Sequence, residues 1–217
     1  MLVYINQMRQ IGAKKTVKHQ IIETCIILFL GIILGVFSKY LDHHQATLPL
    51  VLSFLDQYLD LHNYFSGFAP WIFLATLISI KSDTPLRASI NVFFFLIGML
   101  SGYYIYWYRL IHFIPISYVM IWIIFSFISL FLAYICWYAI GKGKIAILIS
   151  ASIIAVLGNI AFAYGWLYFS IRSFMNLLTY VLGIIILKRE NHEMIMMLGL
   201  SILIAILFHV ILPFQFY

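Results

Sequence analysis

Histidine and aspartate residues gather in one part of the chain, and they are the side chains best suited to chemistry. Imidazole and carboxylate groups together form a ligand set that binds divalent metal ions. The candidate metal or substrate-capture residues are Asp42, His43, His44, Asp56, Asp60, His62, His112 and His209; the last two join the group only through the topology inferred below. No short ligand spacing defines a site among them. The alternative is that they are solvated polar residues at a membrane surface.

Motifs of intramembrane or nucleotide-dependent catalysis are missing from the sequence. It contains no His-Glu-x-x-His zinc pair and no Gly-x-Ser-x-Gly nucleophile elbow. The segment 141–144 reads Gly-Lys-Gly-Lys, a short basic turn rather than a phosphate-binding loop. The last apolar run, 194–212, has no lysine that could carry a retinal Schiff base. The sequence therefore assigns no catalytic residue and no cofactor.

The composition determines the class of protein that must position these side chains. Of the 217 residues, 65% are hydrophobic and 9% are charged, and the mean hydropathy is +1.05. Soluble domains are about 45–50% apolar and about 25% charged. A soluble chain of this size has no interior large enough for so much apolar surface, so lipid must cover it. The composition predicts an integral membrane protein whose first partner is the lipid bilayer.

Seven apolar runs approach the length of about 20 residues that a helix needs to cross a bilayer. Lipid cannot satisfy free backbone groups, so such runs must be helical. The runs are 20–38, 65–80, 88–108, 114–140, 145–165, 170–187 and 194–212. We predict an all-α, polytopic bundle of about seven transmembrane helices in one domain, 20–212. A basic cytoplasmic segment, 1–19, precedes it, and a short outer tail, 213–217, follows.

Basic residues give the orientation. With the N-terminus in the cytoplasm, ten of the thirteen Lys and Arg residues fall in inner segments. Only Lys39, Arg109 and Arg172 fall in outer ones. This distribution follows the positive-inside rule and places the C-terminus outside the cell membrane. Basic loops beside anionic lipid also explain the net charge of +6 without any nucleic acid.

The long outer connection between the first two runs predicts an amphipathic helix over about 47–62. Its polar residues recur at helical spacing, and leucine and aromatic residues fill the remaining positions. Because the polar face carries Asp56 and Asp60, attraction to anionic lipid is not its purpose. We expect this helix to lie in the outer interface, either as a lid over an outward-facing cavity or as a shield for the edge of the bundle.

Two glycine pairs stand at matching depth in the first and third runs. They are Gly31 with Gly35 and Gly98 with Gly102. Small residues four positions apart let helix backbones approach closely. The pairs predict packing between these two spans, with a dimer interface as the alternative.

Aromatic residues cluster where the runs end. Tyr103 to Tyr108 crowd the end of the third run, and Tyr164, Trp166 and Tyr168 mark the end of the fifth. Tyrosine and tryptophan at such positions are typical membrane-interface anchors. The alternative for the first cluster is a platform for a carbohydrate or another ligand.

For function, the sequence favours a small-molecule transport component, either a compact permease or a membrane-embedded substrate-binding subunit. This rests on small size, the acidic outer segment and the lack of a soluble domain. The alternatives are a non-catalytic scaffold, immunity or regulatory subunit with protein partner subunits, and an intramembrane enzyme acting on lipid. A proton-driven mechanism is disfavoured because the predicted spans carry almost no ionisable residue at depth.

Overall fold

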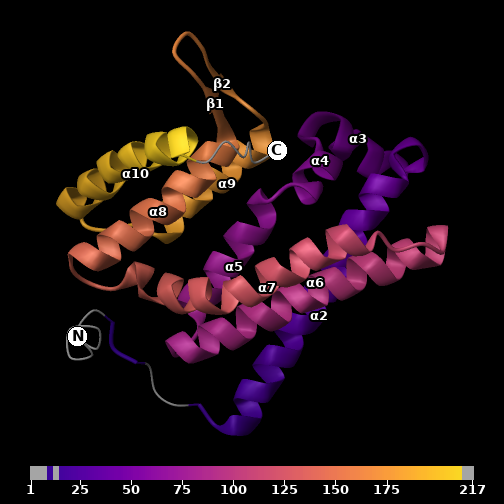
Figure 1. The fold of residues 1–217 in the computed structure, drawn as a ribbon, viewed down its shortest axis with the longest axis horizontal. Coiled ribbons are helices and arrows are strands. Elements are labelled where there is room, and N and C mark those ends of the chain that lie inside the picture. Colours follow the sequence, from indigo (N-terminus) through magenta and orange to yellow (C-terminus); the bar gives the residue numbers. More distant parts are fainter. Residues whose placement is uncertain (1–8, 12–14, 212–217) are drawn as a thin grey trace. The chain divides into compact units, whose positions relative to one another are not determined.

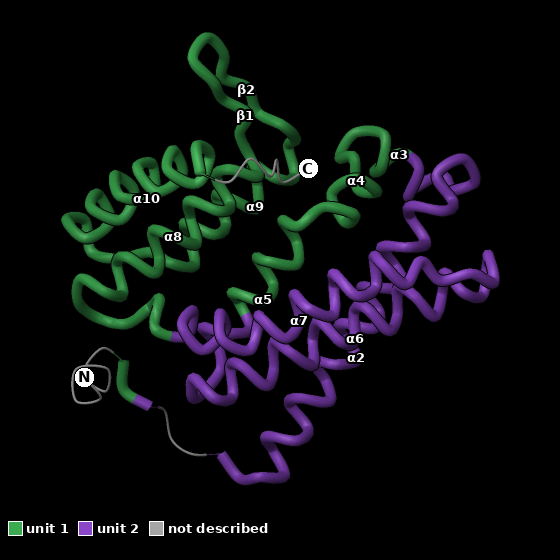
Figure 2. Tube along the Cα trace, viewed as in Figure 1, with its two compact units in different colours: residues 1–10, 54–77, 138–217 green, residues 11–53, 78–137 purple. Residues whose placement is uncertain are grey.

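The computed structural model describes residues 9–11 and 15–211, and this part of the chain is almost entirely helical (Figure 1). It divides into two compact units, each described here by itself (Figure 2). Of the described residues, unit 1 comprises 9–10, Phe54–Leu77 and 138–211, and unit 2 comprises 11, 15–53 and Ile78–Trp137.

Unit 2 is built on three long helices, α2 (Val17–His43), α6 (Pro85–Ile111) and α7 (Ile116–Cys136). Helix α6 packs against both of the others, and Phe95 and Val92 at its centre are fully buried. Local signals set the helix starts. The hydroxyls of Thr16 and Thr84 each accept the backbone N–H three residues ahead, which caps α2 and α6.

The glycine pairs lie where α2 crosses α6. A Cβ atom on Gly31 would collide with the carbonyl oxygen of Phe95, and one on Gly98 would collide with that of Leu28. Gly35 and Gly102 face the opposite backbone in the same way. The two helices of this one chain therefore approach to backbone contact, which no residue with a side chain would permit.

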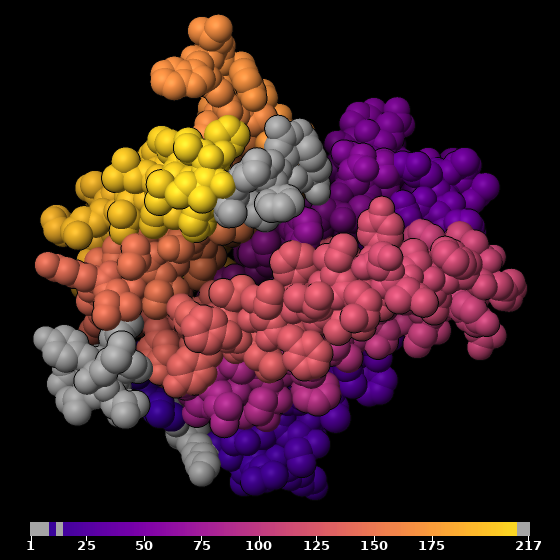
Figure 3. Space-filling model, viewed as in Figure 1, coloured from indigo at the N-terminus to yellow at the C-terminus, as the bar shows by residue number. Residues whose placement is uncertain are grey.

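Unit 1 contains helices α8 (Lys144–Ala161), α9 (Phe174–Ile186) and α10 (Asn191–Ile211). Helix α8 packs against both others, and its alanine-rich face forms the core of the unit. The chain continues from α8 directly into an antiparallel hairpin of β1 (Phe162–Tyr164) and β2 (Phe169–Ile171). The hairpin projects beyond the helices, as the orange segment of Figure 3 shows. It takes up the end of the predicted run 145–165, the gap after that run, and the start of the run 170–187.

The segment predicted as one helix over 47–62 is divided in the structure. A 3-10 turn (Gln45–Thr47) precedes α3 (Leu50–Leu59), and α4 (Leu61–Ser66) follows after a break at Asp60. Asp60 is left-handed, with φ 53°, and the Asp56 carboxylate accepts the backbone N–H of His62 at the start of α4. A carboxylate satisfies the free N–H groups of a helix start, which stabilises the break. The prediction of one continuous helix is therefore wrong in its bounds.

Within the described residues, five helices are long and apolar enough to cross a membrane, and the chain thus has the character of a helical membrane protein. These helices are α2, α6, α7, α8 and α10. The span of α7 includes the 3-10 turn Trp137–Ile140 that continues this helix. The other two predicted spans contain α5 (Ala69–Lys81) and α9, each of 13 residues. At 1.5 Å per residue such a helix extends about 20 Å, less than the roughly 30 Å hydrocarbon core of a bilayer.

Candidate functional site

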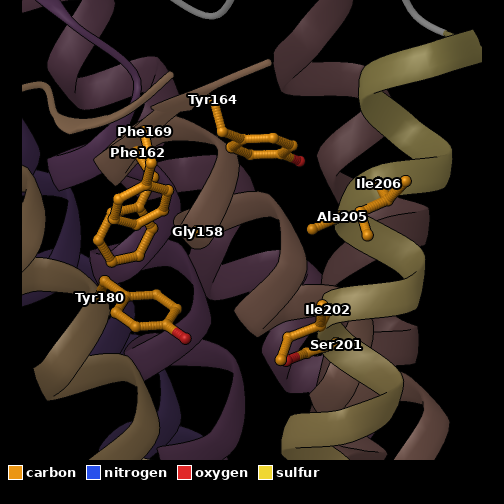
Figure 4. A pocket seen from close by; sticks show the side chains of 9 residues that line it. All are labelled: Gly158, Phe162, Tyr164, Phe169, Tyr180, Ser201, Ile202, Ala205 and Ile206. Atoms are coloured by element: carbon orange, nitrogen blue, oxygen red, sulfur yellow. The ribbon is translucent and has the colours of Figure 1, made fainter. Parts of the chain in front are cut away.

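A cavity of about 380 Å³ lies within unit 1, between the hairpin and helices α8, α9 and α10. Figure 4 shows its two sides. Aromatic rings from the hairpin and α9 form one side, and Ile202, Ala205 and Ile206 of α10 form the other. Its volume lies within the range of about 300–1,000 Å³ that is typical of ligand pockets.

The aromatic side is assembled by the hairpin. The backbone becomes extended at Phe162, directly after α8 ends, and the hairpin register pairs Phe169 with Tyr164, two residues further along β1. Phe169 thus lies diagonally across the hairpin from Phe162. The two rings stack with centroids 5.3 Å apart, and Tyr180 of α9 meets Phe162 edge-on at 5.2 Å. These rings form a continuous apolar surface of a kind suited to hydrocarbon or another ring.

Hydrogen bonds fix the upper edge of the cavity. The Tyr164 hydroxyl donates to the Asn159 side-chain oxygen at 2.6 Å, and the Asn159 amide nitrogen donates to the Ala205 carbonyl at 3.1 Å. This chain of bonds joins β1, α8 and α10. His209 packs against the Tyr164 ring at 4.8 Å.

Two polar groups reach the lining with bonding capacity left. Ser201 donates its hydroxyl proton to the Leu198 carbonyl at 2.8 Å and retains free lone pairs. The Tyr180 hydroxyl makes no hydrogen bond within the part of the chain that the structure describes. No Asp, Glu, Lys or Arg side chain is among the described residues that line the cavity.

The candidate metal residues of unit 1 form one small group and one separate histidine. The His62 ring lies 2.8 Å from the Asp56 carboxylate and 3.5 Å from that of Asp60. Asp56 also caps α4, so its oxygens already accept hydrogen bonds from His62. His209 lies instead at the cavity edge, against Tyr164.

The candidate metal residues of unit 2 have other partners. Asp42 pairs with the buried ammonium of Lys39, which lies 3.5 Å from the Trp107 ring centroid. His44 meets the Tyr106 hydroxyl at 3.2 Å, His43 packs on His44, and His112 ends α6 in a left-handed conformation. Over residues 9–11 and 15–211, no group of three or more His, Cys, Asp or Glu side chains is arranged to hold a metal ion.

A polar network in unit 2 is a feature that sequence reasoning missed. Arg87 donates to the Thr24 hydroxyl and, at 3.0 Å, to the Asn91 oxygen. Asn91, which is fully buried, donates in turn to Glu23 and to Ser82. The available signal was the spacing of four that puts Arg87 and Asn91 on one face of a helix.

The network continues to Lys15, whose ammonium lies 2.9 Å from Glu23 and 3.0 Å from Asp83. Its two cations and two carboxylates balance in charge. Hydrogen bonds to Glu23 and then to Asp83 raise the pKa of Lys15 above its ordinary value of 10.5. The arrangement joins α2 to α6 and to the connection before α6.

The raised pKa of Lys15 predicts that the stability of the fold depends on pH. The stabilisation from Lys15 is fully present below its unfolded pKa and is lost as pH rises through the higher folded pKa. We therefore expect Lys15→Gln to lower the melting temperature at neutral pH, and this difference from the wild type to shrink above about pH 10.5. Thermal melts of both proteins across alkaline pH measure it. A difference that stays constant with pH would contradict the ion-pair role.

No protein family model, curated protein or solved structure matches this chain.

Proposed function

We propose that the protein is a membrane-embedded substrate-binding component of a small-molecule transport system, with the cavity of unit 1 as its ligand site. The observation that carries this proposal is the cavity itself: about 380 Å³, aromatic on one side and aliphatic on the other. Pockets between the helices of a bundle are common ligand sites.

In this proposal the chain crosses the cell membrane seven times, with its N-terminus in the cytoplasm. If only the five longest helices crossed, eight Lys and Arg residues would lie inside and five outside, instead of ten and three. The positive-inside rule thus favours seven. The short helices α5 and α9 then cross where the bilayer thins around them, which costs a fraction of a kcal/mol per Å of mismatch.

The outer amphipathic segment is α3 in this topology. One of its faces is apolar and exposed, with Leu50, Val51, Phe54 and Tyr58 open to the surroundings. We place this face in the outer lipid interface, where an amphipathic helix is stable.

Labelling tests the topology. We expect an impermeant thiol reagent to label Arg109→Cys, at the outer end of α6, in intact cells, and to label Lys142→Cys only after the cells are opened. Both positions are exposed. The native Cys25 and Cys136 are first replaced by serine and alanine. The reverse pattern would invert the orientation, and labelling of both in intact cells would refute the alternation of spans.

Small molecules that stay bound to the extracted protein test the proposed binding function. Ala205 lines the cavity, so Ala205→Phe fills it, whereas Leu203→Phe makes the same ring at an exposed position of α10. We expect the full chain, extracted with its own lipids, to carry a small molecule that mass spectrometry detects. Ala205→Phe should lose it, and Leu203→Phe should keep it.

Two outcomes would refute the binding role. One is the same retained molecules in all three proteins, and the other is no retained molecule in any. A stoichiometric protein partner without a ligand would favour the scaffold or regulatory subunit instead.

A further inference from the structure

The chemistry of the cavity lining restricts the charge of its ligand. The described lining residues carry no formal charge, and the polar groups at the upper edge are already bonded to one another. Burying an ion without a counter-charge or hydrogen-bonding partners costs far more than apolar contact returns. A carboxylate or an ammonium group therefore finds no charged partner among the described lining residues, which favours a neutral ligand.

The two remaining polar groups have complementary roles. Tyr180 has a hydroxyl proton to donate, and Figure 4 shows its oxygen directed across the cavity toward α10. Ser201, on α10, has committed its proton to Leu198 and therefore accepts. A ligand group that accepts from Tyr180 and donates to Ser201 satisfies both. A hydroxyl does this, whereas a ketone or ester oxygen can only accept.

The surroundings of the cavity indicate the source of the ligand. Two residues of the α10 side, Ile202 and Ile206, are 60% and 49% exposed, so the cavity lining continues onto the outer surface of the helix. The adjoining hairpin tip exposes Trp166 and Leu167 completely. Surfaces this apolar in a membrane protein face lipid.

We infer that the cavity binds a neutral amphiphile with a hydrocarbon or aromatic body and a hydroxyl group, taken up laterally from the lipid phase, and that the Tyr180 hydroxyl determines this specificity. The inference rests on the proposed binding function. Tyr180 supplies the hydrogen bond that selects the ligand head group, and the stacked rings and α10 hold its body.

Photolabelling tests the inference with three medium-chain probes that carry the same mid-chain diazirine and end in a hydroxyl, a methyl or a carboxylate. The full chain in lipid nanodiscs is labelled over a range of probe concentrations, and mass spectrometry locates the labelled residues. We expect saturable labelling of the α8–α10 region, with the alcohol half-saturating at the lowest concentration. Tyr180→Phe should raise that concentration about three- to tenfold, the range for one neutral hydrogen bond, and leave the alkane unchanged.

The control is Tyr118→Phe, an exposed tyrosine of α7, which should behave as the wild type. Equal half-saturation by alcohol and alkane, tightest labelling by the carboxylate, or no effect of Tyr180→Phe would overturn the inference while the cavity still binds. Failure of the proposed function looks different: labelling of this region would be unsaturable with all three probes, and Ala205→Phe would not reduce it.

Discussion

Replacing Gly98 with leucine should lower the free energy of unfolding by about 3 kcal/mol, at the upper end of the cost of overpacking a tightly packed contact. Even one added carbon at this position collides with the Leu28 carbonyl of α2, and backbone atoms cannot swing aside as a flexible side chain can. The helices must separate along their whole crossing. We expect Gly31→Leu, on the opposite helix, to have the same effect.

Thermal unfolding of the purified protein in detergent measures this loss. Gly199→Leu is the matched control, because a Cβ atom added at the exposed Gly199 of α10 would meet no atom within 4 Å. It should melt close to the wild type. If Gly31→Leu and Gly98→Leu also melt like the wild type, α2 and α6 do not pack at these glycines.

The second large effect is expected at Arg189, in the connection between α9 and α10. Its side chain is only 6% exposed, and its guanidinium donates to the carbonyls of Ala139 and Gly141 and to the Ser150 hydroxyl. It thus closes the turn before α8. Arg189→Ala removes the side-chain donor to the Gly141 carbonyl and leaves the Ala139 carbonyl with the Ser150 hydroxyl alone, and we expect it to lower the free energy of unfolding by about 3–5 kcal/mol.

Two variants give this prediction its controls. The neighbouring Lys188 is exposed, so Lys188→Ala should change little. Arg189→Lys keeps the charge but lacks the forked donors that serve separate acceptors, so we expect it to recover only part of the stability. The melting temperatures of the wild type and of the three variants in detergent distinguish these outcomes. Full recovery by lysine would show that charge alone matters there, and equal melting of Arg189→Ala and Lys188→Ala would contradict the role of the guanidinium.

Much of the fold can be predicted from the sequence because apolar length is a local property. Each predicted run contains a helix, and α6 and α10 begin and end within three residues of their runs. The lengths of α5 and α9 were overestimated, since hydropathy does not distinguish a helix from the apolar residues beside it. The break at Asp60 was missed because a left-handed aspartate has no strong sequence signal, whereas glycine would have given one.

The candidate site was harder to predict, because it depends on tertiary contacts between residues that are far apart in the sequence. The cavity depends on Phe162 and Phe169 meeting through two strands of three residues, too short to show a repeating pattern. Tyr180 and Ser201 come from two further helices. By contrast, the histidines and aspartates near 42–62 were conspicuous in sequence, but their contacts with Lys39, with one another and with helix ends depend on local geometry that spacing alone does not determine.

The hairpin between α8 and α9 has a consequence for how the chain is made. Its backbone groups bond within the connection: β1 pairs with β2, the Gly165 N–H donates to Tyr168, and the Arg172 N–H donates back to the Ala161 carbonyl. An ordinary loop needs water for such groups, and moving it through hydrocarbon is costly. In the proposed seven-span topology, a connection that already makes its own bonds would let α8 and α9 enter the bilayer together during synthesis, as one prefolded helical pair.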